Sequence, residues 1–309
     1  MECPYVSICC IAYNHEPFIK GAIEGFISQK TTFPYEIIIS DDCSRDDTRA
    51  IISEYRQKYP NLLRDVSPDH NLGMYDNFYH VLETANGKYI ALCDGDDFWT
   101  DVHKLQKQVD ILEQNERLIG CFTDCMAVSE DGRNILMKKR PTVSMEQSGN
   151  YGLRDFLKDN RTSTLSLVYR NNHQEELLCK LKNVKNDFLA DWPLYIFLLT
   201  YGDMYYLSQV TCAYRQNPSS VTHTTWRNER VGRVKASRII CPKVADTLPE
   251  EYADIAKDLR DTRWTWLPLM FAYKHEKRYL PMIGCLIIVC LVCPKSLWNA
   301  WKSRNRKKA

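Results

Sequence analysis

Three carboxylates lie within four residues at Asp94-Gly95-Asp96-Asp97, directly after the apolar run 89–93. Like charges this close repel one another unless a cation or strong hydrogen-bond donors neutralise them. Mg²⁺ and Mn²⁺ typically bind one or two such carboxylates together with phosphate oxygens of a substrate. The alternative is a solvated acidic loop, or aspartates that cap the next helix. The cluster alone supports both interpretations about equally.

A second acidic cluster, Asp41-Asp42-Cys43-Ser44-Arg45-Asp46-Asp47, follows another apolar run. Near-continuous apolar runs are typical of strands buried on both faces of a parallel sheet. Such strands, alternating with helices, predict βαβ units. Ligands bind at the carboxyl ends of these strands, so the two clusters are expected to face one site. The predicted strands are 6–13, 36–40, 62–66 and 88–92.

The rest of the first 215 residues continues this alternation. Helical spacing of apolar residues predicts helices, and alternating or β-branched runs predict strands. An Asp131-Gly132 turn predicts a hairpin. No GxGxxG or GxxxxGK[ST] motif follows a strand, which argues against a dinucleotide-binding or P-loop protein. The expected helices are 18–27, 48–55, 74–85, 105–112, 153–157 and 194–200, and the expected strands are 118–128, 162–169 and 205–214.

Composition narrows the class of protein. A net charge of +2 in 309 residues gives no case for a nucleic-acid partner. The thirteen cysteines are odd in number and sit mostly in apolar runs, as buried thiols do in a reducing compartment. The Cys290–Cys293 pair has no second Cys or His pair nearby, so zinc is not expected. The start, Met1–Pro4, lacks the basic region of a signal peptide. We expect a cytoplasmic protein.

The C-terminal part differs from the rest. Helical patterning begins near residue 227, and the uncharged stretch 279–293 is shorter than the ~20 residues that span a bilayer. Two tryptophans and a run of lysine and arginine follow it. This combination predicts a monotopic segment on the cytoplasmic face of the membrane. A helix packed on the catalytic domain, or an oligomer contact, is the alternative.

Four motifs in order resemble the family-two inverting glycosyltransferases of the GT-A fold. They are Val6-Ser7-Ile8…Ala12-Tyr13-Asn14, the segment 40–46 around Asp41-Asp42, Asn71-Leu72-Gly73, and Asp94-Gly95-Asp96-Asp97. One motif alone is a weak signal, but four in register are specific. The resemblance covers roughly residues 4–215. It implies a mixed, mainly parallel central sheet flanked by helices.

The resemblance implies a nucleotide-sugar site. Tyr13 matches the residue that stacks on the base, and Asp42 matches the carboxylate that accepts the base N–H, with Asp41 supporting the loop. Asp94 matches the first acid of the DxD motif, near the ribose. Asp96 matches the last acid, which coordinates the Mn²⁺ or Mg²⁺ that bridges the diphosphate. The motif positions that complete this nucleotide-sugar site are Asn14, Asn71 and Gly73.

The acceptor side is implied by position. The catalytic base of the family opens a helix, and its match here is Asp191, although Ala190 departs from the usual pair and Asp187 competes. Asp191 also suits a helix N-cap. Arg215 matches a loop near the diphosphate and is suited to a bidentate phosphate contact. A solvent-facing arginine at a strand end is the alternative. Trp99 and Trp192 are suited equally to the sugar pocket and to the core, and His223 is suggestive only.

The combined expectation is an enzyme of two parts, a GT-A domain (1–225) and a helical extension (226–309). It is expected to move a sugar from a nucleotide-diphosphate donor to a glycan or lipid-linked glycan hydroxyl, in surface polysaccharide biosynthesis. The expected partners are the donor, the acceptor and the cytoplasmic membrane surface, with no nucleic acid. The alternative is a non-catalytic nucleotide-sugar-binding or scaffolding module.

Overall fold

The computed structural model describes residues 3–138, 147–158, 162–185, 191–217, 240–260 and 282. The chain forms two compact units, 1–217 and 218–309, and the first carries the α/β fold. The boundary expected after residue 225 falls in the stretch 218–239, outside the described residues, and stays a prediction.

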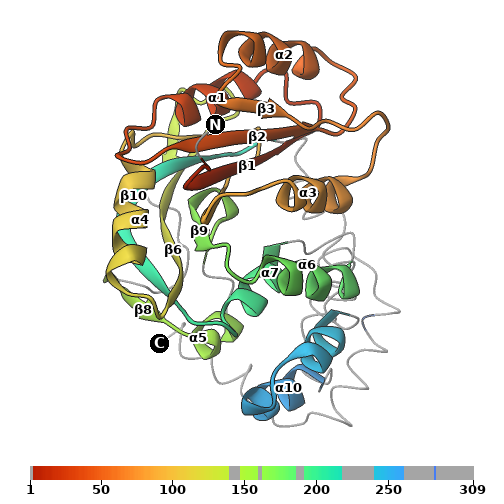
Figure 1. Ribbon diagram of the computed structural model, residues 1–309, viewed down its shortest axis with the longest axis vertical. Coiled ribbons are helices and arrows are strands. Elements are labelled where there is room, and N and C mark those ends of the chain that lie inside the picture. The colour runs from red at the N-terminus through yellow and green to blue at the C-terminus, as the bar shows by residue number, and fades with distance from the viewer. Residues whose placement is uncertain are drawn as a thin grey trace. The chain divides into compact units, whose positions relative to one another are not determined.

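The first four predicted strands form a parallel set. β1 (Val6–Ala12), β2 (Tyr35–Asp41), β3 (Leu63–Asp65) and β4 (Tyr89–Leu92) lie in the order β3-β2-β1-β4 (Figure 1). β1 pairs with β2 along its whole length, from Val6↔Tyr35 to Ala12↔Asp41, and Cys9 pairs with Leu92 of β4. The carboxyl ends of these strands therefore meet at one edge, as the sequence predicts.

Helices connect these strands. Each predicted helix of the first 115 residues is present, and α3 packs on β1 and β2 while α4 packs on β6. Apolar residues at helical spacing face the sheet in each one. The helices are α1 (Ile19–Ile27), α2 (Thr48–Lys58), α3 (Met74–Glu83) and α4 (Lys104–Gln114).

The second half of the sheet departs from the expected parallel pattern. β6 (Leu118–Val128) and β10 (Asp203–Arg215) pair in parallel. β9 (Val168–Arg170) runs antiparallel between β4 and β6. The predicted mixed sheet is confirmed, but in this half antiparallel pairs outnumber the one parallel pair, β6 with β10. Three short strands also pair antiparallel: β5 (Phe98–Trp99) and β8 (Gly149–Tyr151) with β10, and β7 (Ile135–Met137) with β6.

The expected strand 162–169 forms only in part. Thr164–Ser166 is a 3-10 turn, and the strand begins at Val168. α5 (Leu153–Lys158) and α7 (Asp191–Leu198) were predicted, but α6 (Gln174–Asn183), which packs on α7 and α3, was not.

The second unit is helical where it is described. Residues 240–247 are helical, and α10 spans Ala253–Arg260. Almost all of the stretch 279–293 lies outside the described residues, so its membrane association stays a prediction. Among the residues that the structure describes, no helix is both long and apolar enough to cross a bilayer.

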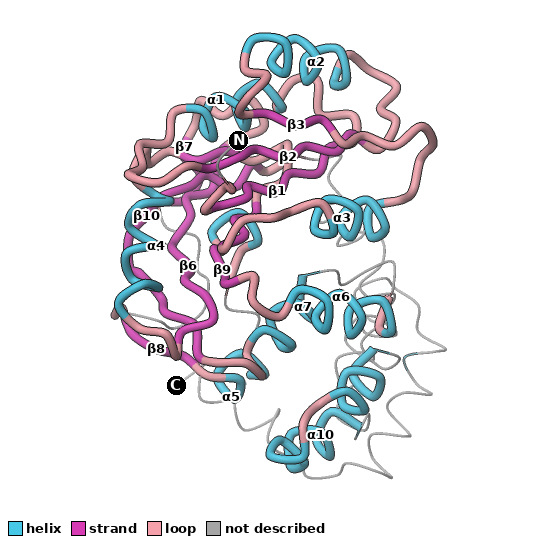
Figure 2. Tube along the Cα trace, viewed as in Figure 1, coloured by secondary structure: helices cyan, strands magenta, loops and turns pink. Residues whose placement is uncertain are grey.

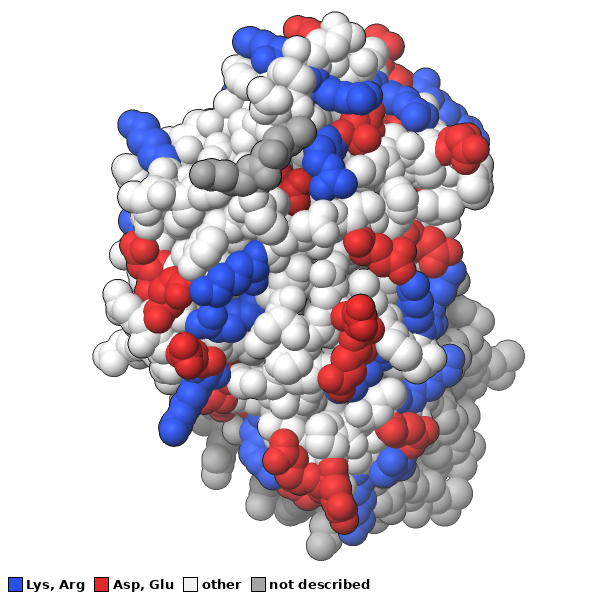
Figure 3. All heavy atoms as spheres, viewed as in Figure 1, with Lys and Arg blue, Asp and Glu red and all other residues white. Residues whose placement is uncertain are grey.

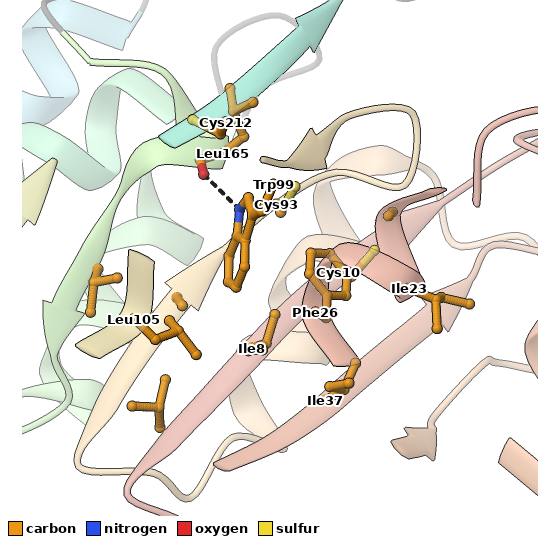
Figure 4. Close-up of a cluster of buried hydrophobic side chains, with 14 of the residues drawn as sticks. Ile8, Cys10, Ile23, Phe26, Ile37, Cys93, Trp99, Leu105, Leu165 and Cys212 are labelled. Atoms are coloured by element: carbon orange, nitrogen blue, oxygen red, sulfur yellow. Dashed lines mark hydrogen bonds between the residues drawn. The ribbon is translucent and has the colours of Figure 1, made fainter. Parts of the chain in front are cut away.

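The core lies between the sheet and helices α1 and α4 (Figure 4). Trp99 is only 4% exposed, its ring meets Phe26 edge-on at 4.9 Å, and its indole N–H donates to the Leu165 carbonyl at 3.0 Å. Trp99 is therefore a core residue and not a wall of a sugar pocket. The ten described cysteines are free thiols, as predicted. On the face shown in Figure 3, acidic and basic side chains are interspersed.

Candidate active site

Asp41 shapes the turn that follows β2. Its carboxylate accepts hydrogen bonds from the Ser44 hydroxyl and from the Ser44 backbone N–H, the latter at 3.0 Å. Its own N–H donates to the Ser67 hydroxyl at 2.9 Å, and the side chain is fully buried. Cys43 in this turn has a φ of 57°, a left-handed conformation that L-residues seldom adopt. These hydrogen bonds show that Asp41 holds the shape of this turn.

Asp42 joins two of the predicted motifs. Its carboxylate oxygens accept the backbone N–H groups of Leu72 at 2.6 Å and Gly73 at 2.9 Å, while the Asn71 side-chain amide donates to the Asp42 carbonyl at 2.7 Å. Gly73 has a φ of 82°, which glycine adopts without strain. A carboxylate has about four acceptor positions, so Asp42 keeps lone pairs for a ligand. Asn71 and Gly73 thus lie against Asp42 and hold its loop.

The end of β1 lies beside the same turn. The Asn14 backbone N–H donates to the Ser44 hydroxyl at 2.7 Å, and the Asn14 side-chain oxygen accepts the Arg45 N–H at 2.9 Å. Its φ is 54°, so Asn14 reverses the chain directly after Tyr13. Tyr13 itself is 41% exposed. An exposed ring at a strand end, next to a buried carboxylate loop, suits stacking on a base.

The loop after β4 sits closely over His15. Gly95 donates its N–H to the Ile11 carbonyl at 2.9 Å. A Cβ placed on Gly95 would lie 2.9 Å from His15 Nδ1, 2.9 Å from Ile19 Cδ1 and 3.1 Å from Ala12 Cβ. Only glycine fits this position without movement. The loop is therefore positioned by steric contact as well as by hydrogen bonds.

His15 links the two acidic loops. Its backbone N–H donates to the Thr48 hydroxyl at 2.8 Å. Its buried Nδ1 has no hydrogen-bond partner among the described residues. Burial lowers the pKa of His15, while the nearby carboxylates of Asp96, Asp46 and Asp41 oppose that change. His15 was not among the predicted site residues, although its place two residues after Tyr13 in the first motif was an available signal.

Arg215 and Asp97 hold the Asp96 loop in place. The Asp97 carboxylate accepts the Arg215 backbone N–H at 2.8 Å, so this acid helps to hold the loop. The Arg215 guanidinium donates to the Asp96 carbonyl at 2.8 Å and to the Glu130 carbonyl at 2.6 Å. It lies 4.9 Å from the ring of Phe18 and is only 7% exposed. The solvent-facing alternative for Arg215 is wrong. The contacts make it a positioning residue, and a phosphate contact stays a prediction.

Asp191, the predicted catalytic base, lies close enough to Asp94 for its charge to influence that carboxylate. It is the first residue of α7, and its carboxylate accepts the Trp192 backbone N–H at 2.8 Å. Burial, with the carboxylates of Asp96 and Asp191 adding to it, raises the pKa of Asp94 to about 7. Residues far apart in the sequence are therefore close enough to interact. Asp187, Ala190 and His223 lie outside the described residues.

The acids suit a hard divalent cation. Asp94 and Asp96 are half-buried, and their mutual repulsion is the kind that a bound cation relieves. No group of three or more His, Cys, Asp or Glu side chains within the described ranges is arranged to hold a metal. Mg²⁺ and Mn²⁺ sites on phosphate substrates commonly use one or two carboxylates, so the donor set fits such an ion.

The sequence pattern of "Glycosyl transferase family 2" matches residues 7–170 of this chain. That match spans more than half of the 309 residues and contains the β1, β2 and β4 loops. The chain belongs to this family.

Its relatives include proteins of assigned and of unknown activity. An uncharacterized protein of Mycobacterium tuberculosis (strain ATCC 25618 / H37Rv) is 35% identical over 225 residues, which is 73% of this chain and 62% of that protein. The chain thus spans less than two thirds of that relative. The putative teichuronic acid biosynthesis glycosyltransferase TuaG of Bacillus subtilis (strain 168) is 26% identical over 72% of this chain and 84% of that protein.

Solved structures share the fold. S. aureus TarS in complex with UDP-GlcNAc superposes with a TM-score of 0.63 at 18% identity, over 84% of this chain and 72% of that one. The mannosyltransferase PcManGT from Pyrobaculum calidifontis, in complex with GDP-Man and Mn²⁺, gives 0.57 at 16% identity over 98% and 85%. These likenesses establish a GT-A architecture for the first unit.

Proposed function

We propose that this chain is an inverting, metal-dependent glycosyltransferase that moves one sugar from a nucleotide-diphosphate donor to a hydroxyl of a glycan or lipid-linked glycan. The observation that carries the proposal is that acids follow β2 and β4, the two strands on either side of β1, and so lie at one edge of the sheet. Asp191, at the start of α7, also contributes to the raised pKa of Asp94, which supports an acceptor-side acid at the same site.

The donor side is assigned from its contacts. Tyr13 stacks on the base, and Asp42 accepts the base N–H with the lone pairs that Leu72 and Gly73 leave free. Asp96 is the metal-binding carboxylate, with Asp94 beside it. A bound Mn²⁺ or Mg²⁺ would neutralise the negative charge that develops on the departing nucleoside diphosphate. PcManGT, which shares the fold, is described in complex with Mn²⁺, and this supports the assignment.

Asp191 serves as the general base. The acceptor oxygen forms a bond to the anomeric carbon while the bond from that carbon to the phosphate oxygen breaks. The electron pair of the broken bond leaves with the nucleoside diphosphate, and the acceptor proton goes to the Asp191 carboxylate. Attack from the face opposite the leaving group inverts the anomeric configuration. Asp191 is half-buried at the first residue of α7.

The biological setting is proposed from the relatives and the C-terminal sequence. TuaG is named for teichuronic acid biosynthesis, and RfbG of Shigella flexneri, 27% identical over 67% of this chain, is named a dTDP-rhamnosyl transferase. We place this chain in surface polysaccharide biosynthesis, at the cytoplasmic face of the membrane. The uncharged stretch 279–293 and the basic tail after it support that location.

Two variants test the chemistry. A thermal-shift screen of UDP-, GDP- and dTDP-sugars, with and without Mn²⁺, first identifies the donor. Asp96→Ala is then expected to abolish both transfer and metal-dependent nucleotide binding, whereas Asp191→Asn abolishes transfer but leaves nucleotide binding intact. Near-normal turnover by Asp191→Asn would show that the base is another residue, and Asp187→Asn is the matched test. Nucleotide binding with no donor hydrolysis or transfer on any acceptor would favour a binding module.

A further inference from the structure

The hairpin formed by β6 and β7 carries an exposed apolar strand. Ile135, Leu136 and Met137 are 58%, 48% and 45% exposed. Side chains alternate between the two faces of a strand, so a strand on a sheet normally buries every second one. Here all six residues from Arg133 to Lys138 are exposed. Among the residues that the structure describes, none covers either face of this short strand, and three consecutive exposed apolar residues call for a functional explanation.

Basic residues flank the apolar triplet. The Arg133 side chain is 86% exposed, and Lys138 is exposed at the other end of the strand. Arg133 lies 4.0 Å from Asp131, a separation at which an exposed pair contributes little. Apolar side chains between cationic ones match the interface of an anionic bilayer, where the former enter the acyl boundary and the latter meet the headgroups.

A second copy of the chain fits this surface less well. Stable protein interfaces bury about 800 Å² on each partner, and a three-residue strand supplies only a fraction of that area. A partner lying on one side would also leave the other side-chain face uncovered. Immersion in a lipid interface covers both faces at once.

The hairpin is held firmly to the candidate active site. Arg215 donates to the Glu130 carbonyl at 2.6 Å and to the Asp96 carbonyl at 2.8 Å. The Gln216 N–H donates to the Val128 carbonyl at 2.9 Å. One arginine therefore connects the turn of the hairpin to the loop of the metal-binding acid. β7 pairs with the C-terminal end of β6, and Figure 2 shows it in the upper part of the same sheet.

We propose that the apolar hairpin, Arg133–Lys138, docks on an anionic lipid surface and so sets the distance between the bilayer and the Asp96 loop. Docking depends only on the exposed residues of the hairpin. That docking presents a lipid-linked acceptor to the site rests on the proposed function. The hairpin is distinct from the C-terminal stretch 279–293, because it lies within the catalytic unit.

The test uses the full-length chain and vesicles of phosphatidylcholine alone or with one quarter phosphatidylglycerol. Co-sedimentation is measured for the unaltered chain and for the triple variant Ile135→Ser/Leu136→Ser/Met137→Ser. We expect the triple variant to lose about tenfold or more in partitioning to anionic vesicles, because it removes the inserting apolar area. Arg133→Gln/Lys138→Gln is expected to reduce binding only on anionic vesicles. Arg56→Gln/Lys58→Gln on α2 makes the same charge change at another exposed place and is the matched control.

Amide hydrogen exchange localises the contact when the C-terminal stretch also binds. Exchange at residues 133–138 is expected to slow when anionic vesicles are added. Unchanged partitioning of the triple variant, or unchanged exchange at 133–138, would overturn the proposal. A dimer in solution that the triple variant dissociates would overturn it in favour of a second copy. Donor hydrolysis without vesicles is expected to persist in the triple variant, so failure of docking is distinguishable from failure of the glycosyltransferase assignment.

Discussion

Replacing Arg215 tests whether its guanidinium positions the Asp96 loop or contacts a phosphate, and this is the sharpest test of the site. Arg215→Met removes two guanidinium hydrogen bonds, to the carbonyls of Asp96 and Glu130. Hydrogen bonds from a charged donor contribute about 1.5–3 kcal/mol each. Methionine keeps much of the packing against Phe18, and the lost cation–π contact adds about 0.5–1 kcal/mol. We expect the free energy of unfolding to fall by about 3.5–7 kcal/mol.

Urea unfolding without nucleotide measures this loss directly. Arg215→Lys, which keeps the charge but not the two-pronged donor geometry, is expected to lose about half as much. Arg56→Met is the control, since Arg56 is an exposed arginine on α2. The reasoning is refuted if Arg215→Met unfolds within about 1 kcal/mol of the unaltered chain while its dissociation constant for the nucleotide rises more than about tenfold. That result would assign the guanidinium to the phosphates.

Three further substitutions probe the loops separately. Gly95→Ala places a Cβ 2.9 Å from His15 Nδ1, and thermal unfolding should show a stability loss of about 1–3 kcal/mol. Gly149→Ala is the control, because the nearest neighbour of its Cβ is 4.0 Å away. A stability loss for Gly95→Ala no larger than that of the control would contradict the prediction. Asp42→Asn converts one of the two carboxylate oxygens that accept the N–H groups of residues 72 and 73 into a donor. Chemical unfolding should show a stability loss of about 1–3 kcal/mol. Unchanged stability with weaker nucleotide binding would show that the carboxylate serves only the ligand. The pKa of Asp94 is raised from 3.8 to about 7. Between these pH values the folded state therefore binds more protons than the unfolded state. The free energy of unfolding should fall by up to about 4 kcal/mol as the pH rises from 4 to 7. In Asp94→Asn, denaturant titrations across this range without metal should lose that slope, and an unchanged slope would assign it to other groups.

The parallel half of the fold was predictable because its signals are local. Apolar runs give strands, helical spacing gives helices, and the acids stand directly after the runs that end in Ser40 and Cys93. Pairing partners are not local, so the antiparallel insertion of β9 between β4 and β6 left no mark in the sequence pattern. Alternation in 162–169 suggested a longer strand, but the segment forms a 3-10 turn before Val168.

Side-chain roles at the site were harder to predict than side-chain positions. The sequence placed Arg215 at the end of a strand but could not show that a turn some 85 residues earlier closes over it. His15 was missed because its importance comes from lying under Gly95, a contact between two strand ends. The same steric relation explains why the second residue of the Asp94–Asp97 cluster is glycine.

The two sides of the site differ in how they are held. On the predicted donor side, backbone N–H groups donate to the carboxylates of Asp41, Asp42 and Asp97. These hydrogen bonds hold the loops in shape without a ligand. At the start of α7, the Asp191 carboxylate accepts the Trp192 backbone N–H, and it also contributes to the raised pKa of Asp94. Prior ordering lowers the entropy that a donor must lose on binding. Substitutions of Asp41, Asp42 or Asp97 should therefore alter stability and donor affinity together, whereas Asp191→Asn should lower turnover and also lower the pKa of Asp94. This difference follows from where the backbone amides point, and the identity of the donor base or sugar does not affect it.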